Sequence, residues 1–396
     1  MARKAAAGTG TIRKKTITRN GKEYTYWEAR YTTGYDPGTG KQIQRSVTGK
    51  TQKEVAKKLK EATAAIDAGT YIAPSKLTVG QWLDTWAAEY LGGVKPLTVT
   101  SYKSTIKTHL KPGLGAIKLD ALATHTIQGF LNNLSKPADE GGSGLSAKTV
   151  KNIHGVLHAA MQQAVSNGYI RFNPTDACIL PRREKAEIKP LDEDMITAFL
   201  KAVKDHQFRD LFEFTLFTGV REGEALGLLW NCVDFDKGTI LIDKQLQPVK
   251  GGKGEYALVS TKNGKGRSIT VAPSVLQILR RVKKQQLENR LRYGECWENS
   301  GFVFTDPLGQ HLKHVTVYKN FKRVVAEIGL PSARFHDLRH SYAVASIKSG
   351  DEIKTVQENL GHATASFTLD TYGHVTDRMK KESADRMEQF IKSVNA

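Results

Sequence analysis

Residues 336–343 read His-Asp-Leu-Arg-His-Ser-Tyr-Ala, and three more stretches belong with them: TGVREGEALGL at residues 218–228, STKNG at residues 260–264 and LGHATASFTLDTYGHV at residues 360–375. Each stretch alone is weak evidence for a catalytic site. An H-x-x-R usually lies on a helix surface, a lone tyrosine usually lies in the core, and a lysine in a Gly-rich turn is usually solvated. His336 and Arg339 are three residues apart and so share one helix face. Together, in this order, the four stretches form a highly specific pattern.

The charge balance indicates an acidic partner. The 396 residues carry a net charge of +19, of which residues 1–75 contribute +9 and residues 76–183 contribute +6. Nucleic acid and anionic membrane surfaces are the usual partners of such a chain, and solvated lysine faces are the alternative explanation. No apolar stretch approaches the length of a membrane span, and the basic start MARKAAAGTGTIRKK lacks the apolar core of a signal peptide. Nucleic acid is therefore the favoured partner, and no membrane association is expected.

Cysteine usage and the absence of nucleotide or metal motifs narrow the class further. Cys178, Cys232 and Cys296 are widely spaced without a CxxC, which fits neither a disulfide framework nor a zinc site. A reducing cytoplasm, in a bacterial cell, is the expected location. The sequence contains no GxxxxGK[ST], GxGxxG or HExxH and no carboxylate cluster with metal spacing, so we expect no cofactor and no metal.

The chain divides into three modules. Residues 10 to about 48 alternate like short strands, with turn signals at Asn20-Gly21 and Asp36–Gly40, and a helix follows over Thr51–Ala68 with Thr51 as its cap. We expect a three-stranded sheet plus one helix. Lysines and aromatic residues interleave on the strands, as in a sheet lying against a DNA groove, although a charged β domain for protein contact is the alternative.

The second module is all helical. A helix capped by Thr78 is followed by one capped by Thr98 and ended by Pro112 and Gly113. Further helices are expected over residues 124–134 and 146–167, and a charged, proline-bounded linker over residues 181–190.

The third module is mainly helical with a small sheet. Asp192 is predicted to cap its first helix, and residues 210–217 continue apolar. Strands are predicted at residues 239–242, 257–261 and 267–271, the last two joined as a hairpin by the turn at 263–266. Ser274 is predicted to cap a long helix that runs to about Arg292.

From about residue 77 to residue 390 the chain resembles the tyrosine recombinases, the integrase family. TGVREGEALGL, HDLRHSYA and LGHATASFTLDTYGHV resemble that family's active-site boxes, and residues 146–174 are similar to the end of its helical core-binding domain. The N-terminal sheet resembles, more loosely, the arm-binding domain of integrases from conjugative transposons and temperate phages. The resemblance implies four segments: an arm-type DNA-binding domain at 1–75, a helical core-binding (SAM-like) domain at 76–180, a linker at 181–190, and a catalytic domain with a C-terminal tail helix at 191–396.

The resemblance also implies roles for individual residues. Tyr372 is the expected nucleophile, and Arg221 and Arg339 suit bidentate donation to the non-bridging phosphate oxygens. A free phenol has a pKa near 10, so the nucleophile needs positive neighbours and a proton acceptor, for which His336 is expected. His362 adds a further donor to the phosphate.

Three more assignments follow from the resemblance. Lys262 is expected to be the general acid for the departing 5′-oxygen, with Lys265 as the rival assignment, and Glu224 is expected to hold the first arginine in place. His340 and His374 are interpreted as structural or DNA-facing.

The implied reaction is integration and excision of a mobile genetic element through a 3′-phosphotyrosyl intermediate and a four-way junction. The covalent intermediate stores the energy of the broken bond, so neither ATP nor metal is needed. Expected partners are double-stranded DNA with core and arm sites, three further copies of the chain in a homotetramer, an excisionase and a DNA-bending host protein. The tail from Asp377 to Val394 packs either on a neighbouring subunit or on its own domain.

Two rival functions remain open at this stage. A type IB topoisomerase uses similar chemistry without joining two sites, and a DNA-binding protein that has lost catalysis is the rival from another class. All six active positions hold competent residues, and a basic N-terminal module precedes the helical one, which favours recombination.

Overall fold

The computed structural model describes all residues except 1–10, 20, 37, 70, 72–75, 183–189, 250–253, 262–263, 265, 363, 373–375 and 395–396. The chain divides into two compact units, Met1–Glu184 and Lys185–Ala396. The boundary falls inside the predicted linker at 181–190. The finer division into domains remains a prediction.

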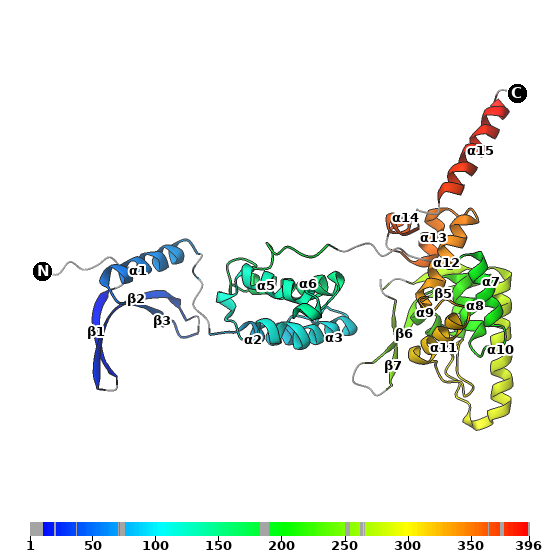
Figure 1. Cartoon of the computed structure of the whole chain (residues 1–396). Coiled ribbons are helices and arrows are strands. Elements are labelled where there is room, and N and C mark those ends of the chain that lie inside the picture. Colours follow the sequence, from blue (N-terminus) through cyan, green and yellow to red (C-terminus); the bar gives the residue numbers. More distant parts are fainter. Residues whose placement is uncertain are drawn as a thin grey trace. The chain divides into compact units, whose positions relative to one another are not determined.

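The first part of unit 1 is an antiparallel sheet, in the order β1-β2-β3, covered on one face by a helix (Figure 1). The strands are β1 (Ile12–Arg19), β2 (Lys22–Tyr35) and β3 (Gln42–Gly49), and the helix is α1 (Gln52–Asp67). Thr51 caps α1 as predicted, by accepting a hydrogen bond from the Glu54 N–H. Side chains alternate across β2, so Ala29 and Tyr31 pack on α1 while Glu28 and Arg30 lie on the opposite, open face.

The second part of unit 1 is all helical, as predicted. Its helices are α2 (Val79–Glu89), α3 (Pro96–Thr105), α4 (Lys111–Leu114), α5 (Thr124–Ser135) and α6 (Ala147–Ser166), with a π turn at Ile106–Leu110 and 3-10 turns at Leu119–Ala121 and Ala138–Glu140. Their core includes Trp82, Leu83, Leu110, Ile127 and Leu157. Thr78 caps α2 with a complete capping box, and Ser146 caps α6.

The prediction that Thr98 caps the second helix is wrong. Lys95 precedes the helix and Pro96 is its first residue, because proline has no N–H to satisfy at that position and its backbone angle is already helical. Pro112 also fails to end the helical path, which continues to Leu114. The π turn, in which the Lys111 N–H bonds the Ile106 carbonyl five residues back, precedes the proline and widens the helix ahead of it.

Unit 2 is mainly helical, and its larger core is rich in aromatic residues. Its helices are α7 (Glu193–Ala202), α8 (Arg209–Thr218), α9 (Glu222–Leu226), α10 (Pro273–Tyr293), α11 (His314–Glu327), α12 (Phe335–Lys348), α13 (Ile353–Leu360), α14 (Ala365–Tyr372) and α15 (Thr376–Val394). Phe212 of α8, Phe321 of α11 and Phe335 of α12 meet edge to face at the centre of this core. Asp192 caps α7 as predicted, but α10 begins at Pro273 after Ala272, one residue before the predicted cap Ser274.

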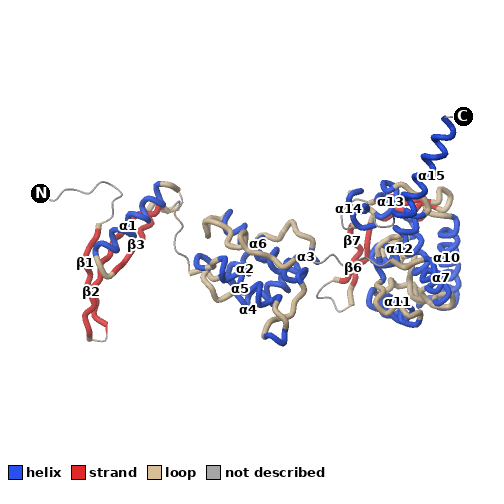
Figure 2. The backbone as a smooth tube through the Cα atoms, turned by 45° about the horizontal axis from the view of Figure 1, so that its top comes forward, coloured by secondary structure: helices blue, strands red, loops and turns tan. Residues whose placement is uncertain are grey.

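The strands of unit 2 form two separate small sheets among the helices (Figure 2). β4 (Val233–Asp234), β5 (Thr239–Ile242) and β8 (Arg267–Thr270) form one sheet, and β6 (Lys244–Pro248) pairs with β7 (Tyr256–Ser260) in the other. The predicted hairpin between residues 257–261 and 267–271 is therefore wrong. β8 pairs with β5 so that the buried residues Ile240 and Ile269 face each other, and β7 pairs with the polar β6, which the sequence pattern did not reveal.

The predicted fold class is confirmed: a three-stranded sheet with one helix, a helical module, and a mainly helical module with small sheets. Within the described residues, no helix is both long enough and apolar enough to span a bilayer.

Candidate active site

Arg221 is fixed by a carboxylate one helical turn ahead of it. It directly precedes α9, and its backbone N–H donates to Glu224 Oε2 at 3.1 Å while its Nη1 donates to Oε1 at 2.7 Å. The Glu224 side chain is 1% exposed, whereas 26% of the Arg221 side chain remains exposed. Burial alone raises the pKa of Glu224, but Arg267 and Arg221 lower it to about 2. The carboxylate is thus charged at neutral pH and holds Arg221 at an accessible edge.

Arg339 connects all three active-site boxes. From α12, its Nη1 donates to the Gly219 carbonyl at 2.7 Å and its Nη2 donates to the Leu360 carbonyl at 2.6 Å. These carbonyls lie two residues before Arg221 and two residues before His362. Burial, followed by the neighbouring charge of Arg221, lowers the pKa of Arg339 to about 9, which leaves the guanidinium charged at neutral pH.

A glycine is required where Arg339 meets the first box. Gly219 ends α8 with φ +65°, in the left-handed region, and a Cβ there would lie 2.3 Å from the Tyr342 ring. Only glycine lets the chain turn here and bring Arg221 beside Arg339.

Two histidines predicted for the site lie beside these arginines. His336 is one turn before Arg339 on α12, and the centroid of its ring is 4.8 Å from that of His340. His362 follows α13, and its Nδ1 lies 3.0 Å from the Thr368 hydroxyl. Burial and the positive charges of Arg339 and Arg221 lower the pKa of His362 to about 3. Burial and the charges of His340, Arg339 and Arg221 lower the pKa of His336 to about 4. Without a bound anion, both rings are therefore neutral at pH 7.

Tyr372 ends α14 and is 3% exposed, packed in a small core with Ile347, Val356 and Leu360. Its hydroxyl lies 2.7 Å from His340 Nδ1, and its ring stacks on His362 with an interplanar angle of 12°. Burial raises the pKa of Tyr372 to about 12, against the lowering effect of Arg339 and Arg221. The hydroxyl is protonated at neutral pH in this arrangement.

The hydrogen bond of the Tyr372 hydroxyl is a finding that the sequence did not suggest. His336 is the proton acceptor expected from the sequence, and His340 was interpreted as structural or DNA-facing, yet His340 is the histidine that the hydroxyl meets. The spacing held a signal, because His336 and His340 are four residues apart and share a helix face. His374 lies outside the described residues.

Arg267 is a second residue that the sequence patterns missed. It begins β8, and its two terminal nitrogens donate to the two carboxylate oxygens of Glu224 at 3.2 and 2.7 Å. Lys262 and Lys265, the two assignments for the general acid, lie outside the described residues; they belong to the segment that links β7 to β8. The structure thus brings Arg221, Glu224, His336, Arg339, His362 and Tyr372 together.

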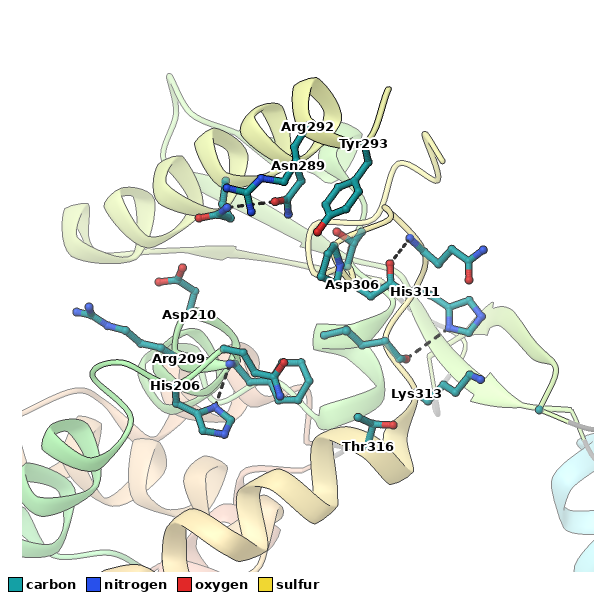
Figure 3. A pocket seen from close by; sticks show the side chains of 18 residues that line it. His206, Arg209, Asp210, Asn289, Arg292, Tyr293, Asp306, His311, Lys313 and Thr316 are labelled. Carbon is teal, nitrogen blue, oxygen red and sulfur yellow. Dashed lines mark hydrogen bonds between the residues drawn. The ribbon is translucent and has the colours of Figure 1, made fainter. Parts of the chain in front are cut away.

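A pocket of about 860 Å³ lies elsewhere in unit 2 (Figure 3). Side chains from the start of α8, the end of α10 and the segment before α11 line it, including His206, Arg209, Asn289, Tyr293 and His311. None of the active-site candidates is among its described lining residues, and much of its charge is already paired, Arg209 with Glu213 and Asp210 with Arg281. The arginine–histidine–tyrosine cluster is therefore kept as the candidate site. Within the described part of the chain, no three His, Cys, Asp or Glu side chains gather as metal ligands would.

Comparison with known families and sequences points to one group of proteins. The model of the phage integrase family matches residues 189–379, and that of the phage integrase N-terminal SAM-like domain matches residues 78–135. A protein named tyrosine recombinase XerC-like from Caldanaerobacter subterraneus subsp. tengcongensis is 29% identical over 96% of this chain and 99% of its own length. The ICEBs1 integrase of Bacillus subtilis is 24% identical over 90% and 95%.

Solved structures agree at the level of the fold. The Tn1549 transposon integrase in complex with a circular intermediate DNA matches with a TM-score of 0.67 and 22% identity, over 79% of this chain and all of that one. A lambda integrase tetramer bound to a Holliday junction matches with a TM-score of 0.55 and 22% identity, over 88% and 96%. The family models, the full-length relatives and the gathered active-site boxes agree, and this chain belongs to the tyrosine recombinase, or phage integrase, family.

Proposed function

We propose that this tyrosine recombinase integrates and excises a mobile genetic element by cutting and rejoining DNA at specific sites. The observation that carries the proposal is the gathering of two arginines, the histidines and a tyrosine from α9, α12, α13 and α14 around one point. Such a set of donors suits a phosphodiester, whose pentacoordinate transition state accumulates negative charge on oxygen. Relatives named as integrases of mobile elements support the wider role.

The chemistry would proceed by two balanced transesterifications. Tyr372 Oη attacks the phosphorus, its proton passes to a histidine, the bond to the 5′-oxygen breaks, and that oxygen takes a proton from Lys262. The 5′-hydroxyl of the partner strand then attacks the phosphotyrosine, and the same groups run in reverse. Arg339 has five N–H donors, two of which bond carbonyls. It is 1% exposed, so its other donors would reach the phosphate, beside those of Arg221, only once the site opens on DNA.

Tyr372 must move before it reacts. Tyr372 is 3% exposed and its hydroxyl is bonded to His340, so in this arrangement the hydroxyl does not meet a DNA phosphate. Attack therefore requires α14 to shift so that the hydroxyl leaves His340, and the raised pKa of Tyr372 falls as the phenol leaves its buried surroundings and stays near the two arginines. We propose that assembly on DNA drives this movement.

The reaction is tested by strand exchange. Plasmids carrying two copies of the sequence that the chain selects from a pool of random duplexes are incubated with the protein without ATP or added metal. We expect recombinant products whose strands are joined between the two copies. Plasmid relaxation without any recombinant would instead favour the topoisomerase alternative, and binding without either product would favour the catalytically silent one.

The open face of the N-terminal sheet supports a role for residues 1–75 as the arm-type DNA-binding domain. Arg13, Lys15 and Arg30 surround Glu28, whose side chain is 8% exposed, at 2.9, 2.8 and 3.7 Å. One carboxylate under three cations leaves this face net positive, and Tyr24 beside them is 53% exposed. A basic, aromatic sheet face of this kind fits a DNA groove.

Removing two of these cations should reduce the salt dependence of DNA binding. For Lys15→Ala with Arg30→Ala, the slope of log K against log salt concentration is expected to fall by about 2, because each phosphate contact contributes about 0.9. Titration of the full-length chain with a selected duplex, at several salt concentrations, measures the slope. The matched control is Lys53→Ala with Lys57→Ala, on the exposed side of α1, which covers the other face of the sheet. Equal slopes for both double variants would assign the DNA contacts to another surface.

Residues 76–180 are proposed to be the core-binding domain, and residues 191–396 the catalytic domain. We propose a homotetramer on DNA, since two duplexes present four strands to cut, assisted by an excisionase and a DNA-bending host protein in the bacterial cytoplasm. The tail helix α15 offers a surface for assembly, because its described apolar residues Met387, Phe390, Ile391 and Val394 are all exposed.

A further inference from the structure

One arginine outside the family boxes connects two of them. Arg267 Nη1 and Nη2 donate to Glu224 Oε1 and Oε2 at 3.2 and 2.7 Å, and Arg267 Nε donates to the Asn359 carbonyl at 2.7 Å. The Arg267 side chain is 13% exposed. All three nitrogens of the guanidinium are therefore used within the protein.

The partners of Arg267 are the supports of two proposed catalytic residues. Glu224 holds Arg221. Its Oε1 accepts hydrogen bonds from both Arg221 and Arg267. Asn359 is the residue before Leu360-Gly361-His362, and its carbonyl is the one that Arg267 binds. Arg267 thereby attaches the start of α9 and the end of α13 to the same point on β8.

Packing at Gly361 shows that the fit around Arg267 is close. Gly361 has φ +63°, and a Cβ built on it would lie 3.0 Å from Arg267 Nη1 and 3.1 Å from its Cδ. The chain turns toward His362 directly against the guanidinium. A lysine cannot reproduce this arrangement, because one ammonium is a point charge that cannot fork onto two carboxylate oxygens and also reach the Asn359 carbonyl.

We propose that Arg267 is a positioning residue for catalysis, which fixes Glu224 and the end of α13 so that Arg221 and His362 meet the same phosphate. This rests on the proposed function of those two residues. We expect no role for Arg267 itself in binding DNA, because each of its three guanidinium nitrogens already bonds Glu224 or the Asn359 carbonyl. Its loss should therefore slow the reaction of bound DNA while leaving the affinity for DNA unchanged.

The test uses the full-length chain at saturating concentration on a nicked duplex carrying the selected site, and measures the rate of covalent complex formation and, separately, the affinity. Arg267→Gln and Arg267→Lys are both expected to reduce the rate by about 10- to 100-fold, because a small misplacement of catalytic groups costs up to about 100-fold, with affinity unchanged within about twofold. The matched control is Arg281→Gln, because Arg281 also forms a bonded fork onto carboxylates, Asp210 and Glu213, away from the site. It should cleave at the wild-type rate.

The pH profile separates positioning of Glu224 from a general loss of structure. In the wild type, Glu224 stays charged in the neutral and mildly acidic range, facing Arg221, Arg267 and Arg339. Without Arg267, burial raises the pKa of Glu224, so the cleavage rate of Arg267→Gln should fall more steeply than that of the wild type from about pH 8 to about pH 5. In the double variant Arg267→Gln with Glu224→Gln, the cleavage rate should not show this steeper fall with decreasing pH, because neither residue then titrates.

Several outcomes would overturn the proposal. Cleavage by Arg267→Lys or Arg267→Gln at the wild-type rate would do so, as would an equal loss of affinity and rate, or the same pH profile in the single and double variants. If Arg267→Gln does not fold, Arg267→Lys carries the test. The wild type and Tyr372→Phe are run in parallel: an adduct in the wild type that needs Tyr372 shows that the proposed function stands even where the role of Arg267 fails.

Discussion

Tyr372→Phe is expected to abolish the covalent protein–DNA complex while leaving DNA binding intact. The substitution removes the only atom that would join the phosphate, and loss of a nucleophile typically reduces a rate by about 10⁴-fold or more. The hydroxyl also bonds His340 in a buried site, so the free energy of unfolding should fall by about 1 kcal/mol. Denaturing gels of a nicked selected site measure the adduct, and urea titration measures the stability.

Tyr342→Phe provides the matched control. Tyr342 lies on α12 in the same unit, and its hydroxyl accepts a hydrogen bond from Asn359 Nδ2 at 3.3 Å. Both variants lose a phenolic hydroxyl, but only Tyr372 is assigned to the reaction. Tyr342→Phe should therefore still form adducts. An adduct that persists in Tyr372→Phe would move the nucleophile to another residue. Absence of adducts from the wild type as well would support the silent DNA-binding alternative.

Features set by neighbouring residues could be predicted from the sequence. Thr51, Thr78 and Asp192 cap the helices expected of them, because a cap depends on the side chain and on the N–H groups two or three residues ahead. The active-site boxes are likewise short and local. Their gathering could be expected from the resemblance to a known family, and the bonds of Arg339 to Gly219 and Leu360 show how it is held.

Features that depend on distant partners could not be predicted. β6 has a polar pattern with one buried residue, Leu246, and becomes a strand only because β7 pairs with it. Arg267 lies between Gly266 of a turn and the polar Ser268, where an arginine usually indicates a solvated edge. Its partners Glu224 and Asn359 are 43 and 92 residues away, so no local pattern reveals them. The bond between Tyr372 and His340 spans 32 residues for the same reason.

Arg339→Ala is expected to reduce both the rate of DNA cleavage and the stability of the fold by a large amount. Removing one preorganised donor from a developing oxyanion costs about 10²- to 10³-fold in rate. Arg339 is 1% exposed and donates to the carbonyls of Gly219 and Leu360, so its loss leaves two buried acceptors without partners, at about 1–3 kcal/mol each. Single-turnover cleavage of the nicked site gives the first quantity, and urea unfolding gives the second.

Two further variants, Arg339→Lys and Arg334→Ala, separate the effect on the cleavage rate from the effect on stability. Lysine keeps the positive charge but has one nitrogen, which cannot bridge two carbonyls and also fork onto a phosphate, so Arg339→Lys should recover part of the stability and little of the rate. Arg334 directly precedes the same helix and pairs with Asp337, but its side chain is 63% exposed. Arg334→Ala should therefore change the stability by less than about 1 kcal/mol and leave the rate unchanged. If folded Arg339→Ala cleaved like the wild type, Arg339 would be a structural connector alone. The phosphate would then depend on Arg221 for its guanidinium, and the two arginine boxes would have separate roles, one for the fold and one for the reaction.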